Sequence, residues 1–463
     1  MMFMSVDVAQ RIMDHGLFLG ADFCELYIEK SNNQSLKVKN EEVHALTGGI
    51  DFGIGVRLIF GTEVLYGYLN SIEELAVTAV VEQLANNYKR ERLHTLTPFQ
   101  LQRYNQQTAA KKLISNISLV DEKVGYLKET TQRCIHLSDK IMVAEAGVFQ
   151  RHQSVELFNT EGLHAQDDRH YCRLNASVIA EDGDEKSYGS LAPGMLQGWE
   201  MHTLHTPESL SQQVVDQALI KLNAVPCPSG NMPVIIGNAF GGVIFHEACG
   251  HLLETTSVQK KSSVFWDKMD SQIAHTVVNA VDDGTLQNEW GSINIDDEGM
   301  PVQRTQLIKD GFLVNFLSDK VGELKTGHAR TGSGRRQSYR YAPASRMRNT
   351  FIDKGESTLD EMITSIDKGI YCKKMGGGSV QPVTGEFNFA AQESYLIENG
   401  KITKPLKSAT LIGKGPEVLQ KISMVGSDLK VMAGMCGSVS GSVPVTVGQP
   451  SLKVDEILVG GQQ

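Results

Sequence analysis

The chain has 463 residues and a mass of 50.8 kDa, and it is 41% hydrophobic and 21% charged. At about 100–200 residues per domain, this length predicts two to four domains and favours two large ones, while the composition excludes extensive disorder. Lys and Arg number 44 and Asp and Glu number 54, so the net charge is −10. A chain that mainly neutralises nucleic-acid phosphates is normally basic, so we expect no nucleic-acid partner.

The N-terminus, the hydropathy and the cysteines predict a cytoplasmic protein. Residues 1–8 lack a basic stretch followed by an apolar run, so we expect no secretory signal. The most apolar window, residues 233–253, contains four polar or ionisable residues: Asn238, His246, Glu247 and His251. Such groups argue against a membrane-spanning helix and a membrane partner. The seven cysteines are scattered and form no CxxC, as is typical of a reducing compartment.

Residues 1–200 predict an N-terminal α+β domain in which helices pack on a mostly antiparallel sheet. Apolar residues at helical spacing predict helices over 5–16, 71–87 and 120–137. Short segments rich in Val, Ile, Leu and Tyr, several of them separated by turn-forming residues, predict strands over 24–30, 34–39, 43–46, 53–60, 63–69, 140–159 and 170–179. A polar, Gln-rich segment over 97–115 predicts a loop.

Residues 201–463 predict a second domain that is rich in β-strands and carries one chemically important helix. A helix over 207–222 and a short strand over 232–236 precede that helix, which runs from about Asn238 past His251. Residues 254–275 are polar and lack an apolar period, so they predict a mobile loop or flap beside it. Asp310-Gly311 and Asn399-Gly400 each lie between apolar runs and predict two hairpins.

The segment His246-Glu247-Ala248-Cys249-Gly250-His251 combines two imidazoles with a carboxylate, the ligand-plus-base arrangement of zinc peptidases. The familiar version spaces the histidines at i and i+4, which places them about 40° apart on a helix. Here the spacing is i and i+5, which places them about 140° apart at about 100° per residue. Because a regular helix cannot direct both rings to one metal, we predict a bulge or break centred near Gly250.

A catalytic zinc site needs a third protein ligand and leaves a fourth position for water. Glu254 lies three residues after His251 and could share its face. The more distant candidates are Asp267, His275, Asp282, Asp283 and Cys436. Small neighbours around Cys436 would let its thiolate approach a metal closely, whereas a buried inert thiol is the simpler interpretation. Residue spacing alone leaves the third ligand open.

Five arginines crowd into 14 residues of the C-terminal half: Arg335, Arg336, Arg340, Arg346 and Arg348. A phosphate-binding patch is one interpretation of such a cluster. In an acidic chain with few aromatic residues between these arginines, internal ion pairs or a clamp for a substrate carboxylate are favoured.

The chain resembles the TldD/PmbA metallopeptidase family, whose members have been called modulators of DNA gyrase. The resemblance covers nearly the whole chain and is strongest from about residue 241 to 461. It rests on HExxxH at 246–251 and on ordered motifs at 281–285, 295–299, 334–339, 346–350, 382–387, 397–401, 409–413 and 436–450.

The active subunit of this family binds zinc through the two HExxxH histidines and a downstream cysteine, and the inactive partner subunits lack these residues. The resemblance therefore implies His246, His251 and Cys436 as Zn²⁺ ligands and Glu247 as the general base. After the cysteine, the family usually continues Gly-Lys-x-Gly-Gln, whereas this chain continues Gly437-Ser438-Val439-Ser440-Gly441-Ser442. Because the chain keeps all three ligands and the base, it is nonetheless similar to the TldD-type proteolytic subunit.

The implied function is zinc-dependent hydrolysis of unfolded or short peptides in a cleft closed by dimerisation. The implied partner is a second copy of the chain or an inactive PmbA-type paralogue. One alternative is a non-catalytic regulatory subunit, against which the complete set of ligands and base argues. A second alternative is an amidase that acts on a small non-peptide substrate.

Overall fold

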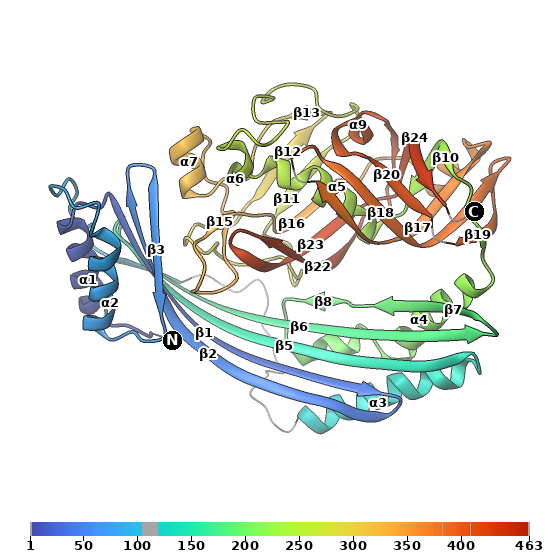
Figure 1. The fold of residues 1–463 in the computed structure, drawn as a ribbon, viewed down its shortest axis with the longest axis horizontal. Coiled ribbons are helices and arrows are strands. Elements are labelled where there is room, and N and C mark those ends of the chain that lie inside the picture. Colours follow the sequence, from blue (N-terminus) through green and yellow to red (C-terminus); the bar gives the residue numbers. More distant parts are fainter. Residues whose placement is uncertain (1, 104–118, 382, 408, 462–463) are drawn as a thin grey trace.

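The computed structural model describes residues 2–103, 119–381, 383–407 and 409–461. The loop predicted over 97–115 contains a short strand at Gln100–Arg103, and its part beyond residue 103 lies outside the described residues. The fold is α+β, as predicted, and its C-terminal part is rich in strands. A long, curved N-terminal sheet lies along one side of the more compact C-terminal part (Figure 1). No helix in the described ranges is long and apolar enough to cross a membrane.

The N-terminal sheet has the strand order β3-β2-β1-β5-β6-β4, and β7 and β8 also pair with β6. Its strands are β1 (Phe23–Lys39), β2 (Glu42–Phe60), β3 (Glu63–Leu69), β4 (Gln100–Arg103), β5 (Ile141–Asn159), β6 (Leu163–Asp182), β7 (Glu185–Leu191) and β8 (Gly194–Met195). The prediction that β1 and β2 are each two short strands is wrong. Asn33 pairs with Gly49 across the two strands, so these turn-forming residues lie inside a ladder.

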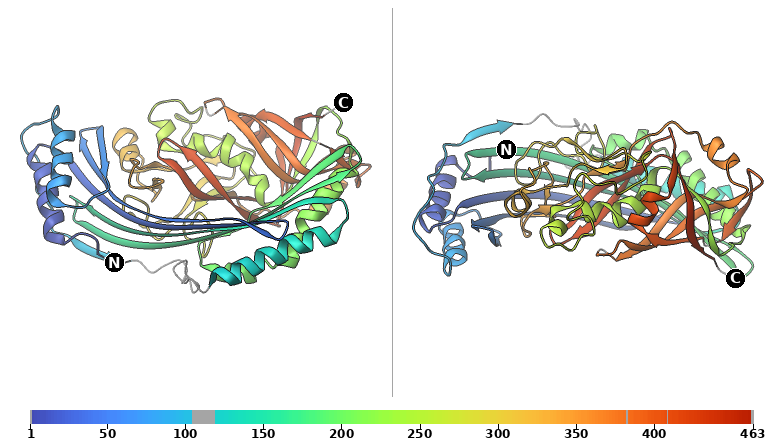
Figure 2. Two further views of the ribbon diagram at one scale, coloured as in Figure 1. Left: turned by 60° about the horizontal axis from the view of Figure 1, so that its bottom comes forward. Right: turned by 90° about the horizontal axis from the view of Figure 1, so that it is seen from above.

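Two helix pairs pack at opposite ends of this sheet (Figures 1 and 2). The first pair is α1 (Val6–Phe18) and α2 (Glu74–Ala85), and the second is α3 (Leu119–Leu137) and α4 (Pro207–Leu222). Strand β1 contributes Leu26 and Ile28 to the first core and Leu36 and Val38 to the second. Helix α4 packs on β6 and β7 of the N-terminal sheet. The domain boundary at residue 200 stays a prediction.

The C-terminal part contains two larger sheets. In the first, pairing runs β17-β10-β24-β20-β18, and a β17–β18 pairing closes the ring. Its main strands are β10 (Gly230–Ile236), β17 (Lys368–Gln381), β18 (Glu386–Glu398), β20 (Thr410–Lys414) and β24 (Leu452–Gly460), with β9 (Val225–Pro226), β19 (Lys401–Lys407) and β21 (Ile422–Val425) beside them. The short helices α7 (Lys320–Thr326), α8 (Leu359–Thr364) and α9 (Gly415–Gln420) flank these sheets, and β14 (Gly334–Arg335) pairs with β15 (Ala344–Ser345).

The second sheet of the C-terminal part has the order β13-β12-β11-β16-β23-β22, so β22 lies at its edge. Its strands are β11 (Ala280–Asp283), β12 (Arg304–Lys309), β13 (Phe312–Leu313), β16 (Asn349–Ile352), β22 (Lys430–Ser438) and β23 (Gly441–Gln449). Both predicted hairpins are confirmed. Asp310 and Gly311 have φ of 50° and 83°, and Asn399 and Gly400 have φ of 50° and 69°, as two-residue hairpin turns require.

A buried ionic network joins the N-terminal sheet to the C-terminal part. The guanidinium of Arg57 lies 2.5 Å from the carboxylates of both Glu25 and Glu298. Arg336 donates to the other Glu25 oxygen at 2.6 Å, and Arg169 pairs with Asp297 at 2.7 Å. Two motifs on which the family resemblance rests, 295–299 and 334–339, therefore hold the two parts of the chain together.

The predicted flap over 254–275 is instead a packed segment. It begins with the short helix α6 (Thr255–Val258), and Phe265 and Ile273 are buried in the core. Hydrogen bonds connect the segment to its neighbours: Ser263 Oγ donates to the Leu252 carbonyl, and the Ile273 N–H donates to the Gly311 carbonyl. Ser262, Ser263 and Gln272 donate to neighbouring main-chain carbonyls, so a segment without an apolar period is nevertheless packed.

Candidate metal centre

The helix that carries the histidines is broken between them, which confirms the sequence prediction. Helix α5 (Val243–Ala248) carries His246. The next residue, Cys249, has a φ of −132° and a ψ of −47°, which are not helical. A separate 3-10 turn, η3 (Gly250–Leu253), carries His251. The break reorients the chain so that the two imidazole rings lie edge to face, with their centroids 5.2 Å apart and their planes at 82°.

Gly250 follows the break, but conformational freedom is not what makes glycine necessary there. Gly250 is absent from the glycines with positive φ. A Cβ at this position would lie 2.3 Å from Sδ of the buried Met347. Glycine is therefore needed because the turn packs directly against Met347.

Cys436 reaches the centre from β22, in the hairpin that β22 forms with β23. It pairs with Val443 on β23 and is buried. The guanidinium of Arg346 donates to the Cys436 carbonyl, to Ser440 Oγ at 3.0 Å and to the Gly441 carbonyl at 2.8 Å. Arg346 thereby fixes the hairpin turn on which the position of the thiol depends.

The structure brings His246, His251 and Cys436 together, with ligand atoms all within 4.8 Å of one another. Nε2 of His251 lies 3.2 Å from Sγ of Cys436. Other candidates are engaged elsewhere, since Asp282 pairs with Arg348 and Asp283 accepts hydrogen bonds from Thr285. Within the described ranges, this is the one such group of three metal-ligating side chains.

The chemistry of this group fits a zinc ion. His246 is 1% exposed, and neither ring nitrogen has a hydrogen-bond partner among the described residues. A buried nitrogen without a hydrogen-bond partner destabilises the folded chain, so an ion bound at this position would remove that free-energy cost. Two imidazoles and a thiolate form the nitrogen and sulfur donor set that zinc prefers.

Glu254, the near-sequence candidate for the third ligand, lies behind His251. Its Oε2 is 3.1 Å from Nδ1 of His251, and its Oε1 accepts the main-chain N–H of Met347 at 3.3 Å. The carboxylate is buried, so this hydrogen bond orients the ring strongly. The i, i+3 spacing indicates this proximity, but it does not distinguish a metal ligand from a residue that orients one.

The charges around the sulfur atom favour a thiolate. Burial raises the pKa of the Cys436 thiol, but the facing imidazoles of His246 and His251 outweigh burial and bring the pKa to about 3. For His251 burial acts in the other direction and lowers the pKa, but the Glu254 carboxylate and Cys436 raise that pKa well above its ordinary value. Thiolate is the ligand form of cysteine, and a cation bound here would take the place of the proton on His251.

Glu247 faces the same space from the solvent side. Its Oε2 lies 3.7 Å from Nε2 of His251, and 29% of its side chain is exposed. The carboxylate is therefore close to the metal-ligating atoms and still accessible to water. This is the position that a general base requires.

The arginine cluster serves internal contacts, which confirms the favoured interpretation. Arg336 pairs with Glu25, Arg348 with Asp282 and Arg340 with Asp51. Arg335 donates to the Met347 carbonyl, and Arg346 binds the hairpin of Cys436.

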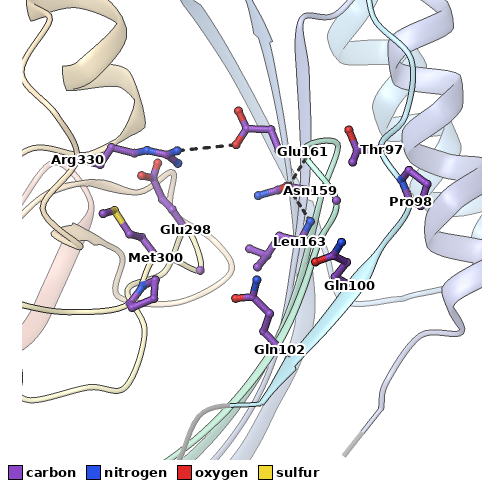
Figure 3. A pocket seen from close by; sticks show the side chains of 13 residues that line it. Thr97, Pro98, Gln100, Gln102, Asn159, Glu161, Leu163, Glu298, Met300 and Arg330 are labelled. Atoms are coloured by element: carbon purple, nitrogen blue, oxygen red, sulfur yellow. Dashed lines mark hydrogen bonds and ion pairs between the residues drawn. The ribbon is translucent and has the colours of Figure 1, made fainter.

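A cavity of about 370 Å³ opens between the two parts of the chain. Gln100, Gln102 and Leu163 face Glu298 and Met300 across it (Figure 3). At its rim, Arg330 and Glu161 form an ion pair at 4.0 Å. None of the four predicted site residues lines this cavity.

Comparison with known proteins shows how the whole chain is related to a family. Three family models match it in order: PmbA/TldA metallopeptidase domain 1 over 24–87, the central domain over 119–222 and the C-terminal domain over 229–461. The chain belongs to the PmbA/TldA metallopeptidase family. The third model contains all four residues that the sequence proposes as ligands and base.

Relatives in this family share nearly the full length. The chain is 37% identical over 455 residues to the metalloprotease TldD homolog of Haemophilus influenzae, covering 95% of this chain and 93% of the relative. It is 24% identical over 447 residues to the zinc metalloprotease TldD homolog of Saccharolobus solfataricus, covering 96% and 97%. The crystal structure of TldE from Thermococcus kodakarensis has the same fold, with a TM-score of 0.76, 20% identity, and coverage of 98% and 100%.

Proposed function

We propose that this PmbA/TldA family member is a zinc-dependent metallopeptidase that hydrolyses unfolded or short peptides. The observation that carries the proposal is the convergence of His246, His251 and Cys436 around the unpaired, buried nitrogens of His246. The name of the Saccharolobus solfataricus relative, a zinc metalloprotease, supports the choice of metal. Zinc, when bound, supplies a Lewis acid for the scissile carbonyl and lowers the pKa of a water to about 7.

In this mechanism, each residue of the site has one task. His246, His251 and Cys436 hold the ion, while Glu254 and Arg346 fix two of these ligands. The Glu247 carboxylate accepts the proton of the attacking water and then delivers it to the leaving amine. Its partial exposure allows water to reach it, and its distance of 3.7 Å from Nε2 of His251 keeps it beside the reacting atoms.

The edge of the sheet next to Cys436 supports a peptide as the substrate. The Thr446 N–H of β23 donates to the Arg348 carbonyl, so the neighbouring β23 residues direct their main-chain groups to β22. By this alternation, Ala433 and Met435 direct their own main-chain groups away from β23; Ala433 is buried, whereas Met435, beside Cys436, is exposed at the edge of the sheet. An extended peptide can pair with such an edge, and main-chain pairing tolerates many sequences.

We also propose that the active form is a dimer in the cytoplasm, formed with a second copy or with an inactive PmbA-type paralogue. The resemblance that supplies the catalytic residues also supplies this expectation. All seven cysteines are unpaired and buried, which is consistent with a reducing compartment.

The test combines metal content with peptide cleavage. Elemental analysis of the purified protein should find about one zinc per chain, and an unfolded peptide should be cleaved at a rate that a chelator abolishes and added zinc restores. Full activity without metal would overturn the proposal. Zinc binding without cleavage of any peptide would favour the non-catalytic subunit or the small-molecule amidase.

A further inference from the structure

A second cavity, of about 480 Å³, lies between the N-terminal sheet and the C-terminal sheets, and it is strongly basic. Its walls include four cationic side chains, Arg173, Lys373, Lys374 and Lys430, and one acidic side chain, Asp428. We call it the cationic cavity. This excess of positive charge stands out in a chain of net charge −10. The volume is in the usual range of ligand-binding pockets, about 300–1,000 Å³.

The nearby carboxylates do not neutralise all of this charge. Asp428 already accepts hydrogen bonds from Asn238 and Ser451. Lys373 and Lys374 share the single carboxylate of Glu393, at 2.7 and 3.7 Å.

Arg173 and Lys430 have no carboxylate partner among the described residues. Arg173 donates to the Ala192 carbonyl at 3.3 Å and lies 5.7 Å from the ring centroid of Trp290. Burial lowers the pKa of Arg173, and no anion offsets this effect. Lys430 is exposed at the start of β22. Two cations at one cavity are thus available to an anionic ligand.

The cationic cavity adjoins two of the three elements that carry the metal-ligating residues. Asn238, Ala239 and Phe240 line it and lead directly into α5, which carries His246. Lys430 and Met432 line it from β22.

Alternation along β22 connects the cavity to the sulfur atom. Lys430 and Met432 stand on the same face of the strand as Cys436. Gly434 lies between them on that face and carries no side chain, and a Cβ there would meet nothing nearer than 3.6 Å. Met432 is four residues from Cys436, or about 13 Å along an extended strand.

We propose that the cationic cavity is a substrate subsite that binds a carboxylate of the peptide about three to five residues from the scissile bond. The carboxylate comes from an acidic side chain or from the C-terminus of the peptide, since both offer the same charge to Arg173 and Lys430. This inference rests on the proposed peptidase function, because it requires a peptide that extends along β22 from the cavity to Cys436.

The first experiment uses a set of neutral, unfolded, fluorescence-quenched peptides with one defined cleavage site. A single Glu is moved through positions two to six on either side of the site, and each peptide has a Gln counterpart. A further pair carries a free or an amidated C-terminus. At one or two positions, kcat/KM for the Glu peptide should exceed that for the Gln peptide about tenfold, mainly through KM. The terminus pair separates the two sources of the carboxylate.

Variants then assign the preference to the cavity. Lys430→Glu should remove or reverse the preference for Glu, and Arg173→Gln should reduce it. Lys401→Gln replaces an exposed lysine at the start of β19, away from the cavity, and should preserve the preference. Because Lys430 is exposed, its variant keeps the test valid even if Arg173→Gln fails to fold. The preference should also fall as salt is raised, because salt screens exposed charges.

Direct binding separates this inference from the peptidase proposal. Fluorescence anisotropy with the Glu247→Gln protein should show about tenfold tighter binding of the preferred Glu peptide than of its Gln counterpart. If peptides are cleaved but no position prefers Glu, or if Lys430→Glu leaves the preference intact, the subsite is overturned and the peptidase stands. If no peptide is cleaved but the binding preference persists and Lys430→Glu removes it, the peptidase proposal fails and the subsite stands.

Discussion

The carboxylate of Glu254 lies 3.1 Å from Nδ1 of His251, on the opposite side of the ring from the Nε2 that faces Cys436. An ionised carboxylate can only accept a hydrogen bond, so Nδ1 carries a proton, and Nε2 is the nitrogen that a metal would take once its own proton is released. The second Glu254 oxygen accepts the Met347 N–H, which holds the carboxylate in place. Glu254 therefore sets the tautomer and direction of His251 and adds no ligand.

Replacing Glu254 with Gln should weaken zinc binding about 10- to 100-fold, the usual cost of losing a group that orients a ligating histidine. A glutamine can present either its oxygen or its NH₂ group to Nδ1, so it no longer imposes one tautomer. Competition with a chromophoric zinc chelator measures the affinity. Glu417→Gln, at an exposed position, is the matched control. Equal affinity in the wild type and the Glu254 variant would show that the hydrogen bond does not support the site.

Replacing Glu247 with Ala should lower the rate of peptide cleavage at least about 100-fold and leave the zinc content near one per chain. Glu247 is close to the ligands but is outside the group of three that converges on the metal position. Cleavage assays and elemental analysis on the same sample test both halves. Loss of zinc would make Glu247 a ligand, and cleavage at the wild-type rate would remove it from the mechanism.

Replacing Cys436 with Ala should reduce zinc affinity far more than replacing Glu254 with Ala. The first change removes a thiolate ligand, while the second leaves all three ligands present but one poorly oriented. Cys372→Ala, another buried cysteine, controls for the cavity that the substitution creates. Chelator titrations rank the variants. The opposite order would identify Glu254 as the ligand.

Replacing Glu25 with Gln should destabilise the chain by about 3–5 kcal/mol, because it removes the carboxylate that Arg336 pairs with and one of the two that Arg57 pairs with. Glu25 contacts both Arg57 and Arg336, and all three side chains are at most 1% exposed. Glu74→Gln breaks the exposed Arg11–Glu74 pair and should cost far less, because solvent screens that pair. Denaturant unfolding provides the comparison. Similar losses in the two variants would mean that the buried network does not hold the parts together.

Local patterns predicted those features of the fold that depend on local forces. Asp310-Gly311 and Asn399-Gly400 form the expected hairpins because a tight turn with positive φ needs such residues. The break between His246 and His251 follows from helix geometry once both rings are required to share one metal. In contrast, Asn33 and Gly49 resemble turn residues but pair with each other across β1 and β2, and only the partner strand determines that outcome.

The candidate site was predictable only in part for the same reason. His246 and Glu247 are adjacent and carry their own signal, whereas Cys436 lies 185 residues after His251 and approaches it only through the β22–β23 hairpin. Local spacing could not choose between Cys436 and Glu254, and the family resemblance supplied the choice. The contact between Gly250 and Met347 was equally invisible, because no local pattern indicates which side chain packs on a glycine.

That contact supports a last prediction, in which Gly250→Ala damages the site by crowding. The new Cβ would lie 2.3 Å from Sδ and 3.1 Å from Cε of Met347, which is fully buried and cannot swing into solvent. Overpacking of this kind costs about 1–3 kcal/mol. Because the Met347 N–H binds Glu254, a shift of Met347 should also lower zinc affinity.

A double-mutant cycle separates crowding from backbone strain. Met347→Ala removes the two atoms that the new Cβ would meet, so Gly250→Ala should cost clearly less in the Met347→Ala background than in the wild type. Gly125→Ala, on α3 with nothing within 4 Å, should be neutral or stabilising by up to about 1 kcal/mol. Unfolding free energies and zinc affinities are measured for all four members of the cycle. Equal costs of Gly250→Ala in both backgrounds would show that the backbone at the helix break, and not the packing of Met347, requires glycine.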